Sequence, residues 1–274
     1  MCFGLLTIFT VQNNINMKKF FLIAAGIMIL AVSCNNQGND KKSQQRRDTI
    51  VKEGVFAMKM NEVKVKDASC DSLADNCAHV LINYPVFTEK SMETANNIIS
   101  KSIVDLLGQK ESDNNLDVEV AANNFIKEYA DFKSENPDSQ QIWNFRLKSR
   151  VSYSDNSKVS ILFASEVYSG GAHASQTQMY MNFDVKGNLL KAEDFISNMK
   201  KLNIVAEQNF RMRKGMKEGQ TYSEAGFNFP DDKFTLPENI GIADSLYILH
   251  YNPYEIAPYS MGPTQLIIKM DEVK

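Results

Sequence analysis

Hydrophobic and polar residues recur with two different periods along this chain, and the period indicates which segments form strands and which form helices. Residues 56–65 and 80–86 show the short apolar alternation typical of strands. Residues 91–107 and 117–133 instead repeat their apolar positions at helical spacing. Gly108 stands where the C-terminal cap of the first helix is expected. Both helices therefore have an apolar face that should pack against a sheet.

From residue 142 onward the period changes to two. Apolar and polar residues alternate over 142–153, which predicts a half-buried strand, and Asp155 and Asn156 supply a turn into a second strand at 159–168. The further elements expected are a strand at 177–183, a helix at 197–214, mostly loop at 216–240, and a final hairpin of 246–251 with 266–270. The sequence thus predicts an α+β fold, with a mixed or antiparallel sheet and about three helices packed on it. Residues 55–274 should form one compact domain.

The N-terminal region has the pattern of an export signal. Met17 precedes two lysines and a short apolar run, 20–32, which is too short for a comfortable transmembrane helix. The ending 30–34 resembles a bacterial lipobox, and in such proteins the signal peptide is cut before the residue equivalent to Cys34, which carries the lipid. Residues 1–33 are therefore expected to be a lipoprotein signal peptide with its start at Met17. The alternative is an ordinary signal peptide that happens to end near a cysteine.

Composition narrows the location and the partners. Residues 34–54, which would carry the lipidated cysteine, are largely polar and predict a flexible tether. The net charge of the chain is −3, and no run of basic residues occurs, so no nucleic-acid partner is expected. The expected location is the bacterial cell envelope, lipid-anchored to a membrane on its periplasmic side or at the cell surface.

Two of the four cysteines, Cys70 and Cys77, lie close together in a polar stretch. In an exported chain a small disulfide loop is plausible there. Such a closure would stabilise the fold by about 2–3 kcal/mol on the loop-entropy estimate. The alternative is a pair of free thiols.

Several stretches, one in the first half of the chain and the others in the second half, resemble a known family. They are Tyr84-Pro85, 168–173, 182–184 with Gly187 and Leu190, and Tyr251 with 254–259 and Gly262. With these residues the chain resembles the extracytoplasmic domain shared by a lysozyme-sensing anti-sigma factor (RsiV) and the N-terminal part of a peptidoglycan deacetylase. The resemblance spans about 55–274. It implies an α+β domain with a binding role at the cell envelope, and it is not expected to carry over sigma-factor control or deacetylation.

Two loops are the candidate binding surface: a Gly-Gly loop after residue 168 and a loop rich in Tyr and Pro at 251–262. Tyrosine combines a large apolar area with a polar tip, and prolines stiffen a loop, so both suit recognition. The candidate ligand-binding residues are Tyr168, Gly170, Gly171, His173, Tyr251, Tyr254, Glu255 and Tyr259. The alternative is that these rings close the end of the sheet and pack on the Gly-Gly loop.

Catalytic and metal-binding patterns are weak. The three histidines, 79, 173 and 250, are far apart and lack zinc-ligand spacing, so no metal or cofactor is expected. His173 also suits a structural role, bonding the loop backbone. Glu255 is expected to accept N–H groups of its own loop. A glycosidase would need two carboxylates about 5–10 Å apart. The carboxylates near the loops are Glu166, Asp184, Glu193, Asp194 and Glu255.

Three functional hypotheses remain. The leading one is a non-enzymatic envelope lipoprotein that binds or senses a protein, such as a lysozyme-like protein, or a cell-wall ligand. The second is a glycan or peptidoglycan hydrolase with a carboxylate pair, with Glu166, Asp184 or Glu255 as the acid. The third is a lysozyme-binding decoy or inhibitor.

Overall fold

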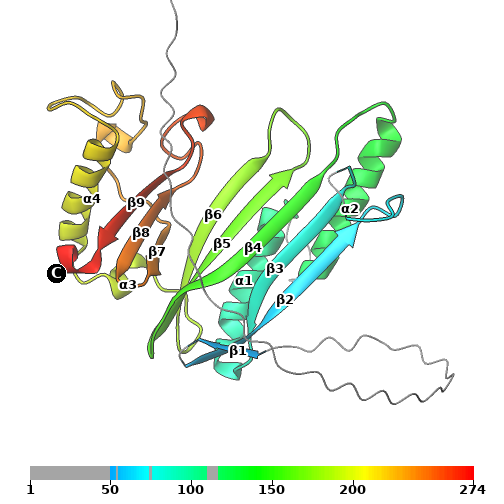
Figure 1. The fold of residues 1–274 in the computed structure, drawn as a ribbon, viewed down its shortest axis with the longest axis horizontal. Helices are drawn as coiled ribbons and strands as arrows, with labels where there is room; N and C mark the ends of the chain where they lie inside the picture. The colour runs from blue at the N-terminus through cyan, green and yellow to red at the C-terminus, as the bar shows by residue number, and fades with distance from the viewer. Residues whose placement is uncertain (1–49, 54, 74–75, 110–116) are drawn as a thin grey trace, which may run out of the picture. The chain divides into compact units, whose positions relative to one another are not determined.

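In the described part of the chain, six strands form the larger of two sheets, and their order in the sheet follows the chain (Figure 1). The computed structural model describes residues 50–53, 55–73, 76–109 and 117–274. The strands are β1 (Ile50–Glu53), β2 (Phe56–Lys66), β3 (His79–Phe87), β4 (Asn144–Ser154), β5 (Lys158–Tyr168) and β6 (Ser175–Asp184). Every neighbouring pair is antiparallel except β3 with β4, which is parallel. The sheet is therefore mixed.

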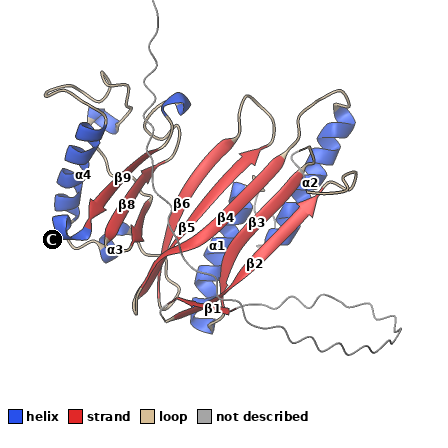
Figure 2. Cartoon of the chain, viewed as in Figure 1, coloured by secondary structure: helices blue, strands red, loops and turns tan. Residues whose placement is uncertain are grey.

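The parallel pair needs a long crossover, and two helices form it: α1 (Glu93–Leu106) and α2 (Val118–Glu135). Both lie on one face of the six-stranded sheet (Figures 1 and 2). The side chain of Asp117 accepts the backbone N–H groups at the start of α2, which fixes where that helix begins. The apolar faces of the two helices and of the sheet together make the first hydrophobic core.

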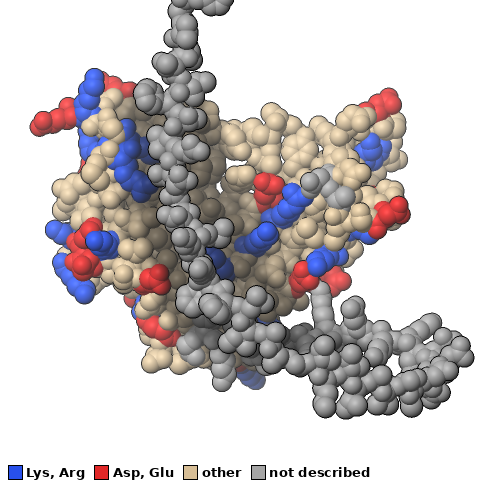
Figure 3. Space-filling view, viewed as in Figure 1, with Lys and Arg blue, Asp and Glu red and all other residues tan. Residues whose placement is uncertain are grey.

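The other face of this sheet carries polar side chains in rows that cross the strands. Arg146 on β4 lies opposite Glu166 on β5, and Glu166 lies opposite Gln176 on β6. The next row is Lys148, Ala164 and Gln178. Because side chains alternate between the faces of a strand, both rows project from the same side. In Figure 3 a line of Lys and Arg side chains runs over β4, with a negative side chain beside it.

The smaller sheet has three antiparallel strands, β7 (Ile240–Ala243), β8 (Leu246–Tyr251) and β9 (Thr264–Lys269). A short helix, α3 (Ala192–Phe195), and the longer α4 (Met199–Arg213) precede it. Helix α4 packs against β9. One face of the sheet and α4 enclose a second hydrophobic core.

This second core is largely aromatic. The ring of Phe210 on α4 lies at its centre and contacts five other rings, those of Tyr222, Phe227, Phe229, Phe234 and Tyr251. The segment between α4 and β7, expected to be mostly loop, has little regular structure but supplies four of these rings to the core.

Side-chain amides join the smaller sheet to strand β6. The Asn252 amide accepts the N–H of Gln178 (2.8 Å) and donates to the carbonyl oxygen of the same residue (3.0 Å). Asn239 accepts the N–H of Tyr180 (2.8 Å) and donates to the Gln178 carbonyl oxygen (2.7 Å). These bonds replace the ladder that another strand would supply to the edge of β6.

Two closer contacts complete the junction. The Asn182 amide donates to the carbonyl oxygen of Ile240, at 2.8 Å. Gly241 lies against the ring of Tyr180, where an added Cβ would come within 1.9 Å of Cδ1. Only glycine allows this approach of β7 to the six-stranded sheet.

The predicted fold class, α+β with mixed and antiparallel sheets, is confirmed. The expectation of one sheet and three helices was incomplete, because the described residues contain two sheets and four α-helices. Strand β7 begins at the last residue of the expected loop, 216–240. A disulfide joins Cys70 and Cys77, with their Cα atoms 5.9 Å apart, as the spacing predicted.

The expected signal peptide at 1–33 and the lipidation site, Cys34, lie outside the described residues. Most of the expected tether, 34–54, lies outside them too. Among the described residues, no helix is both long and apolar enough to cross a membrane.

Candidate functional site

The two predicted loops meet and form an aromatic cluster, which consists of His173, Tyr254 and Tyr259. The imidazole of His173 stacks on the ring of Tyr259, with centroids 3.8 Å apart and planes 14° apart. Nε2 of His173 lies 3.3 Å from the Tyr254 hydroxyl. The Tyr259 hydroxyl donates to the carbonyl oxygen of Ala174, at 3.2 Å. The structure therefore brings together residues 81 or more positions apart in sequence.

The Gly-Gly loop is shaped by its glycines. Gly170 and Gly171 have φ values of 103° and 101°, a region that other L-residues rarely adopt. The hydroxyl of Tyr168 donates to the Gly171 carbonyl oxygen, and Nδ1 of His173 lies 3.1 Å from the Ala174 carbonyl oxygen. The structural role considered for His173 is therefore present, and the same ring also builds the exposed cluster.

Tyr251 was wrongly placed among the binding residues. Its side chain is 1% exposed, and its hydroxyl donates to the carbonyl oxygen of Thr235 inside the second core. Burial raises the pKa of this phenol. The two residues differ because Tyr251 is the last residue of β8 and lies in the second core, whereas Tyr254 lies in the loop beyond the strand.

Tyr254 is an exposed aromatic residue of the cluster. Its side chain is 66% exposed, and its backbone has φ 69°, in the left-handed region. A non-glycine residue there costs about 1 kcal/mol or more, so the surrounding loop must enforce it. Strain of this kind at an exposed aromatic ring is typical of a binding loop.

Glu255 stabilises the same loop, as predicted. Its carboxylate accepts the backbone N–H of Asn252, at 2.8 Å. Burial raises the pKa of this carboxyl, the hydrogen bond from Asn252 opposes the shift, and nearby Glu238 adds to it. Glu255 as a whole remains exposed, so burial affects only its carboxyl group, which points back toward its own loop.

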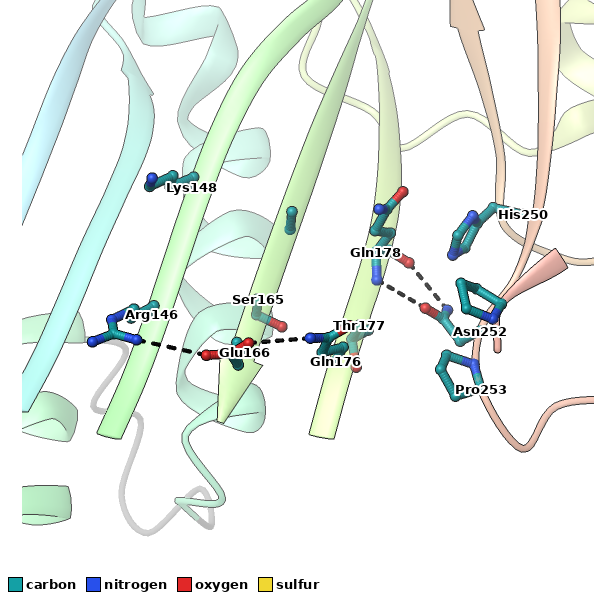
Figure 4. A pocket seen from close by; sticks show the side chains of 12 residues that line it. Arg146, Lys148, Ser165, Glu166, Gln176, Thr177, Gln178, His250, Asn252 and Pro253 are labelled. Carbon is teal, nitrogen blue, oxygen red and sulfur yellow. Dashed lines mark hydrogen bonds and ion pairs between the residues drawn. The ribbon is translucent and has the colours of Figure 1, made fainter. Parts of the chain in front are cut away.

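A groove lies beside the aromatic cluster, between the open face of β4–β6 and the start of the Tyr/Pro loop (Figure 4). Its volume is about 290 Å³. The floor carries the two polar rows of the larger sheet, and the wall consists of His250, Asn252, Pro253 and Pro263. Pro253 of the wall directly precedes Tyr254, so the Tyr/Pro loop contributes both to the groove and to the aromatic cluster.

The charged residues of the floor are Arg146, Lys148 and Glu166. Nη1 of Arg146 lies 3.7 Å from Oε1 of Glu166, and Gln176 donates to the other carboxylate oxygen at 3.1 Å. Both partners of the ion pair are more than a third exposed, so the pair contributes about 0–1 kcal/mol. Lys148 has no hydrogen-bond or ion-pair partner within the described part of the chain. The floor therefore has a net positive charge.

His250 is the buried histidine of the wall, with 3% of its surface exposed. Its Nδ1 has no hydrogen-bond partner among the described residues. Burial lowers the pKa of the imidazole, although a hydrogen bond with the Asn252 side chain opposes the shift. A neutral imidazole therefore faces the positive floor at neutral pH.

Sequence reasoning missed the groove. Lys148, Gln178, His250 and Asn252 occupy ordinary strand and loop positions, and nothing in their spacing shows that two sheets bring them together. The one usable signal was the alternation of basic residues at 146, 148 and 150 on a predicted strand.

The carboxylates proposed for catalysis are dispersed. Glu166 and Asp184 lie near opposite ends of the β5–β6 hairpin, eight strand positions apart, or roughly 26 Å. Asp184 accepts the N–H groups of Lys186 and Asn188 in a tight turn. These hydrogen bonds outweigh the effect of burial and lower the pKa of its carboxyl. Asp194 accepts the N–H of Lys191 at the start of α3.

A second cavity, of about 620 Å³, contains two other carboxylates, Glu193 and Glu238. Asn182 also lines it, and the Oδ1 atom of this buried side chain has no partner among the described residues. Both glutamates are exposed, however, so neither is in the desolvated setting that a general acid needs. Within the described ranges, no three or more His, Cys, Asp or Glu side chains are grouped so that they could hold a metal ion.

Sequence comparison places two family models on the chain. Residues 72–176 match the family described as deacetylase PdaC, and residues 188–271 match DUF3298, a family of proteins of unknown function. The PdaC match ends at the first residues of β6, and the DUF3298 match extends from before α3 into the residues after β9. No protein with a curated description is similar enough in sequence to match.

Two solved structures share the fold. A DUF3298 family protein from Pseudomonas aeruginosa PAO1 has a TM-score of 0.56 and 16% identity, over 79% of this chain and 92% of that protein. A member of the DUF3298 family from Bacteroides fragilis NCTC 9343 has a TM-score of 0.58 and 19% identity, over 80% and 92%. At these identities the likeness shows the fold alone.

Proposed function

We propose that this protein is a lipid-anchored binding or sensing module of the bacterial cell envelope. One observation carries the proposal: two loops distant in sequence converge on an exposed aromatic cluster, with Tyr254 held in a strained backbone conformation. Preformed aromatic surfaces suit recognition because binding then orders few additional groups. The ligand we propose is a protein, such as a lysozyme-like protein, or a component of the cell wall.

The lipid anchor is the second part of the proposal and rests on the signal at 17–34. A cysteine that carries several acyl chains would hold the domain stably at a membrane. Replacing Cys34 by serine should move the protein from the membrane fraction to the soluble fraction. If that variant stays in the membrane fraction, the proposed anchor is wrong.

The binding test uses residues 46–274, which include both cores and form one compact unit. Calorimetric titration with lysozyme and with purified peptidoglycan should give saturable binding to one of them. Tyr254→Ala should weaken that binding at least tenfold, since a central aromatic anchor contributes about 2 kcal/mol or more.

Met212→Ala is the matched control, because it removes an exposed apolar side chain, 72% exposed, from α4. It should leave the affinity unchanged. If neither ligand binds, or if the two variants weaken binding equally, the recognition role of the aromatic cluster is refuted.

A hydrolase is the second candidate. The cavity that contains Glu193 and Glu238 is the observation in its favour, and the exposure of both carboxylates is the observation against it. Release of soluble fragments from purified peptidoglycan by residues 46–274 would support it. That activity should be lost in Glu193→Gln or Glu238→Gln and kept in Glu166→Gln. The absence of any release by the unmodified protein would reject this candidate.

A further inference from the structure

We propose that the groove binds a carboxylate group of a peptide, with Lys148 and Arg146 on its floor and His250 and Asn252 in its wall. This inference rests on the proposed binding function and names the ligand chemistry of the surface beside the aromatic cluster. The carboxylate can be the C-terminus of the peptide or the side chain of an acidic residue, since both present the same two oxygens.

The charges of the groove favour an anion. Its lining contains two cationic side chains and one carboxylate, Glu166. Lys148 is exposed and has no hydrogen-bond or ion-pair partner among the described residues, so its three donors remain for a ligand. Arg150 follows two positions later on β4, and alternation along the strand directs it to the same face. An incoming carboxylate therefore meets a positive surface on the sheet.

His250 is a second, independent indication of a ligand. A buried ring nitrogen without a hydrogen-bond partner is unfavourable, and native folds rarely leave such groups unexplained. The ring lines the groove (Figure 4), so a polar ligand can supply hydrogen bonds that the described part of the chain does not.

The remaining lining favours a peptide over a sugar acid. Apart from His250, the described residues that line the groove include no aromatic ring, so the floor and wall offer no stacking platform for a pyranose. Pro253, Pro263 and Ala164 instead provide small apolar surfaces. The side-chain amide of Gln178, on the floor, can both donate to and accept from peptide groups.

Asn252 gives the site rigidity. Its amide is held by two hydrogen bonds to the backbone of Gln178, so the wall of the groove is fixed to its floor. A groove whose walls are already fixed loses little conformational freedom when a ligand enters.

The test is an NMR titration of ¹⁵N-labelled residues 46–274 with three tri-alanine probes, all acetylated at the N-terminus. The first has a free C-terminal carboxylate, the second is amidated, and the third is amidated with its last residue changed to Asp. We expect saturable shifts at the amides of β4–β6 with the first or the third probe, and none with the second. Whichever probe binds identifies the source of the carboxylate.

Lys148→Gln should weaken that binding roughly tenfold, because it removes a hydrogen bond between charged groups. Lys201→Gln, an exposed lysine on α4, is the matched control and should have no effect. Equal binding of the amidated probe, no saturable shift in the groove, or equal effects of the two lysine variants would overturn the proposal.

This outcome is separable from the proposed function. If the peptide binds while lysozyme and peptidoglycan do not, the carboxylate site stands and the proposed function is wrong. If lysozyme or peptidoglycan binds through Tyr254 while the peptides do not, the carboxylate site is wrong.

Discussion

His250 shows how burial determines the charge of one side chain in the groove. Its folded-state pKa lies below the ordinary value of about 6.5 because the ring is buried, in spite of the bond to Asn252. Below about pH 6.5 the unfolded chain takes up this proton more readily than the folded chain does. Stability is therefore lost as the pH falls through this value, and it is restored above it.

We expect His250→Gln to reduce the loss of stability between pH 7.5 and pH 5.5. Urea unfolding of residues 46–274 at both pH values measures it. Groups such as Glu255, whose raised pKa acts in the opposite direction, are common to both proteins and cancel in the comparison. His173→Gln, at an exposed position, is the control. An unchanged pH dependence in His250→Gln would contradict the assignment.

Residue identity alone could not divide the tyrosines into exposed and buried groups. Tyr251 and Tyr254 stand in the same Tyr/Pro stretch, and composition suggests one role for both. Their roles differ because Tyr251 ends β8 on the side of the second core, whereas Tyr254 lies in the loop beyond it. Which side of a strand is buried depends on partners that the local pattern does not identify.

At the scale of the elements, side chains satisfy the edge of β6. Asn239 and Asn252 supply four hydrogen bonds to its backbone. An unpaired edge strand is prone to open or to pair with another chain. These two amides therefore both attach the smaller sheet and protect the edge.

Asn252→Ala should destabilise the protein by about 1–3 kcal/mol, because it leaves backbone groups of Gln178 without these partners. The backbone N–H of Gln178 should also exchange with solvent faster, as measured by NMR hydrogen exchange. Asn136→Ala, at the end of α2, gives the comparison. Unchanged exchange at Gln178 would show that another group satisfies this edge.

The longer elements could be predicted because each has one clear period. The alternation at 142–153 and 159–168 and the helical spacing at 91–107 correspond to β4, β5 and α1 within a few residues. Strand β7 was missed because it has only four residues, one of them a glycine, and it follows a segment rich in Gly and Pro. The position of β7 depends on its packing against Tyr180, and a local sequence pattern cannot indicate such a long-range contact.

On the scale of the whole molecule, the part of the chain that the structure describes has two cores and one junction. The first core contains the side chains of α1, α2 and the larger sheet, and the second contains those of α4, the smaller sheet and the aromatic segment between them. The junction consists of β7 and the amides described above.

We expect the two cores to unfold together in residues 46–274. Trp143, the single tryptophan, reports on the first core, and hydrogen exchange at Leu249 reports on the second. Both should give the same free energy of unfolding. In the double variant Asn239→Ala/Asn252→Ala the two values should separate. Separate values in the unmodified protein would mean that the cores are independent.

The parallel pairing of β3 with β4 has a consequence for the order of folding. The hairpins β2–β3, β4–β5 and β5–β6 join segments that are near in sequence, whereas His79 must find Asn144 across both helices of the crossover. Closing such a long loop is entropically costly, and contacts of this kind slow folding. The β2–β3 hairpin and the antiparallel strands β4–β5–β6 should therefore form first, and the pairing of β3 with β4 should form last. A chain that has not yet paired β3 with β4 would expose the apolar side chains that pack against α1 and α2 in the native fold. Aggregation should therefore compete with folding at this late intermediate.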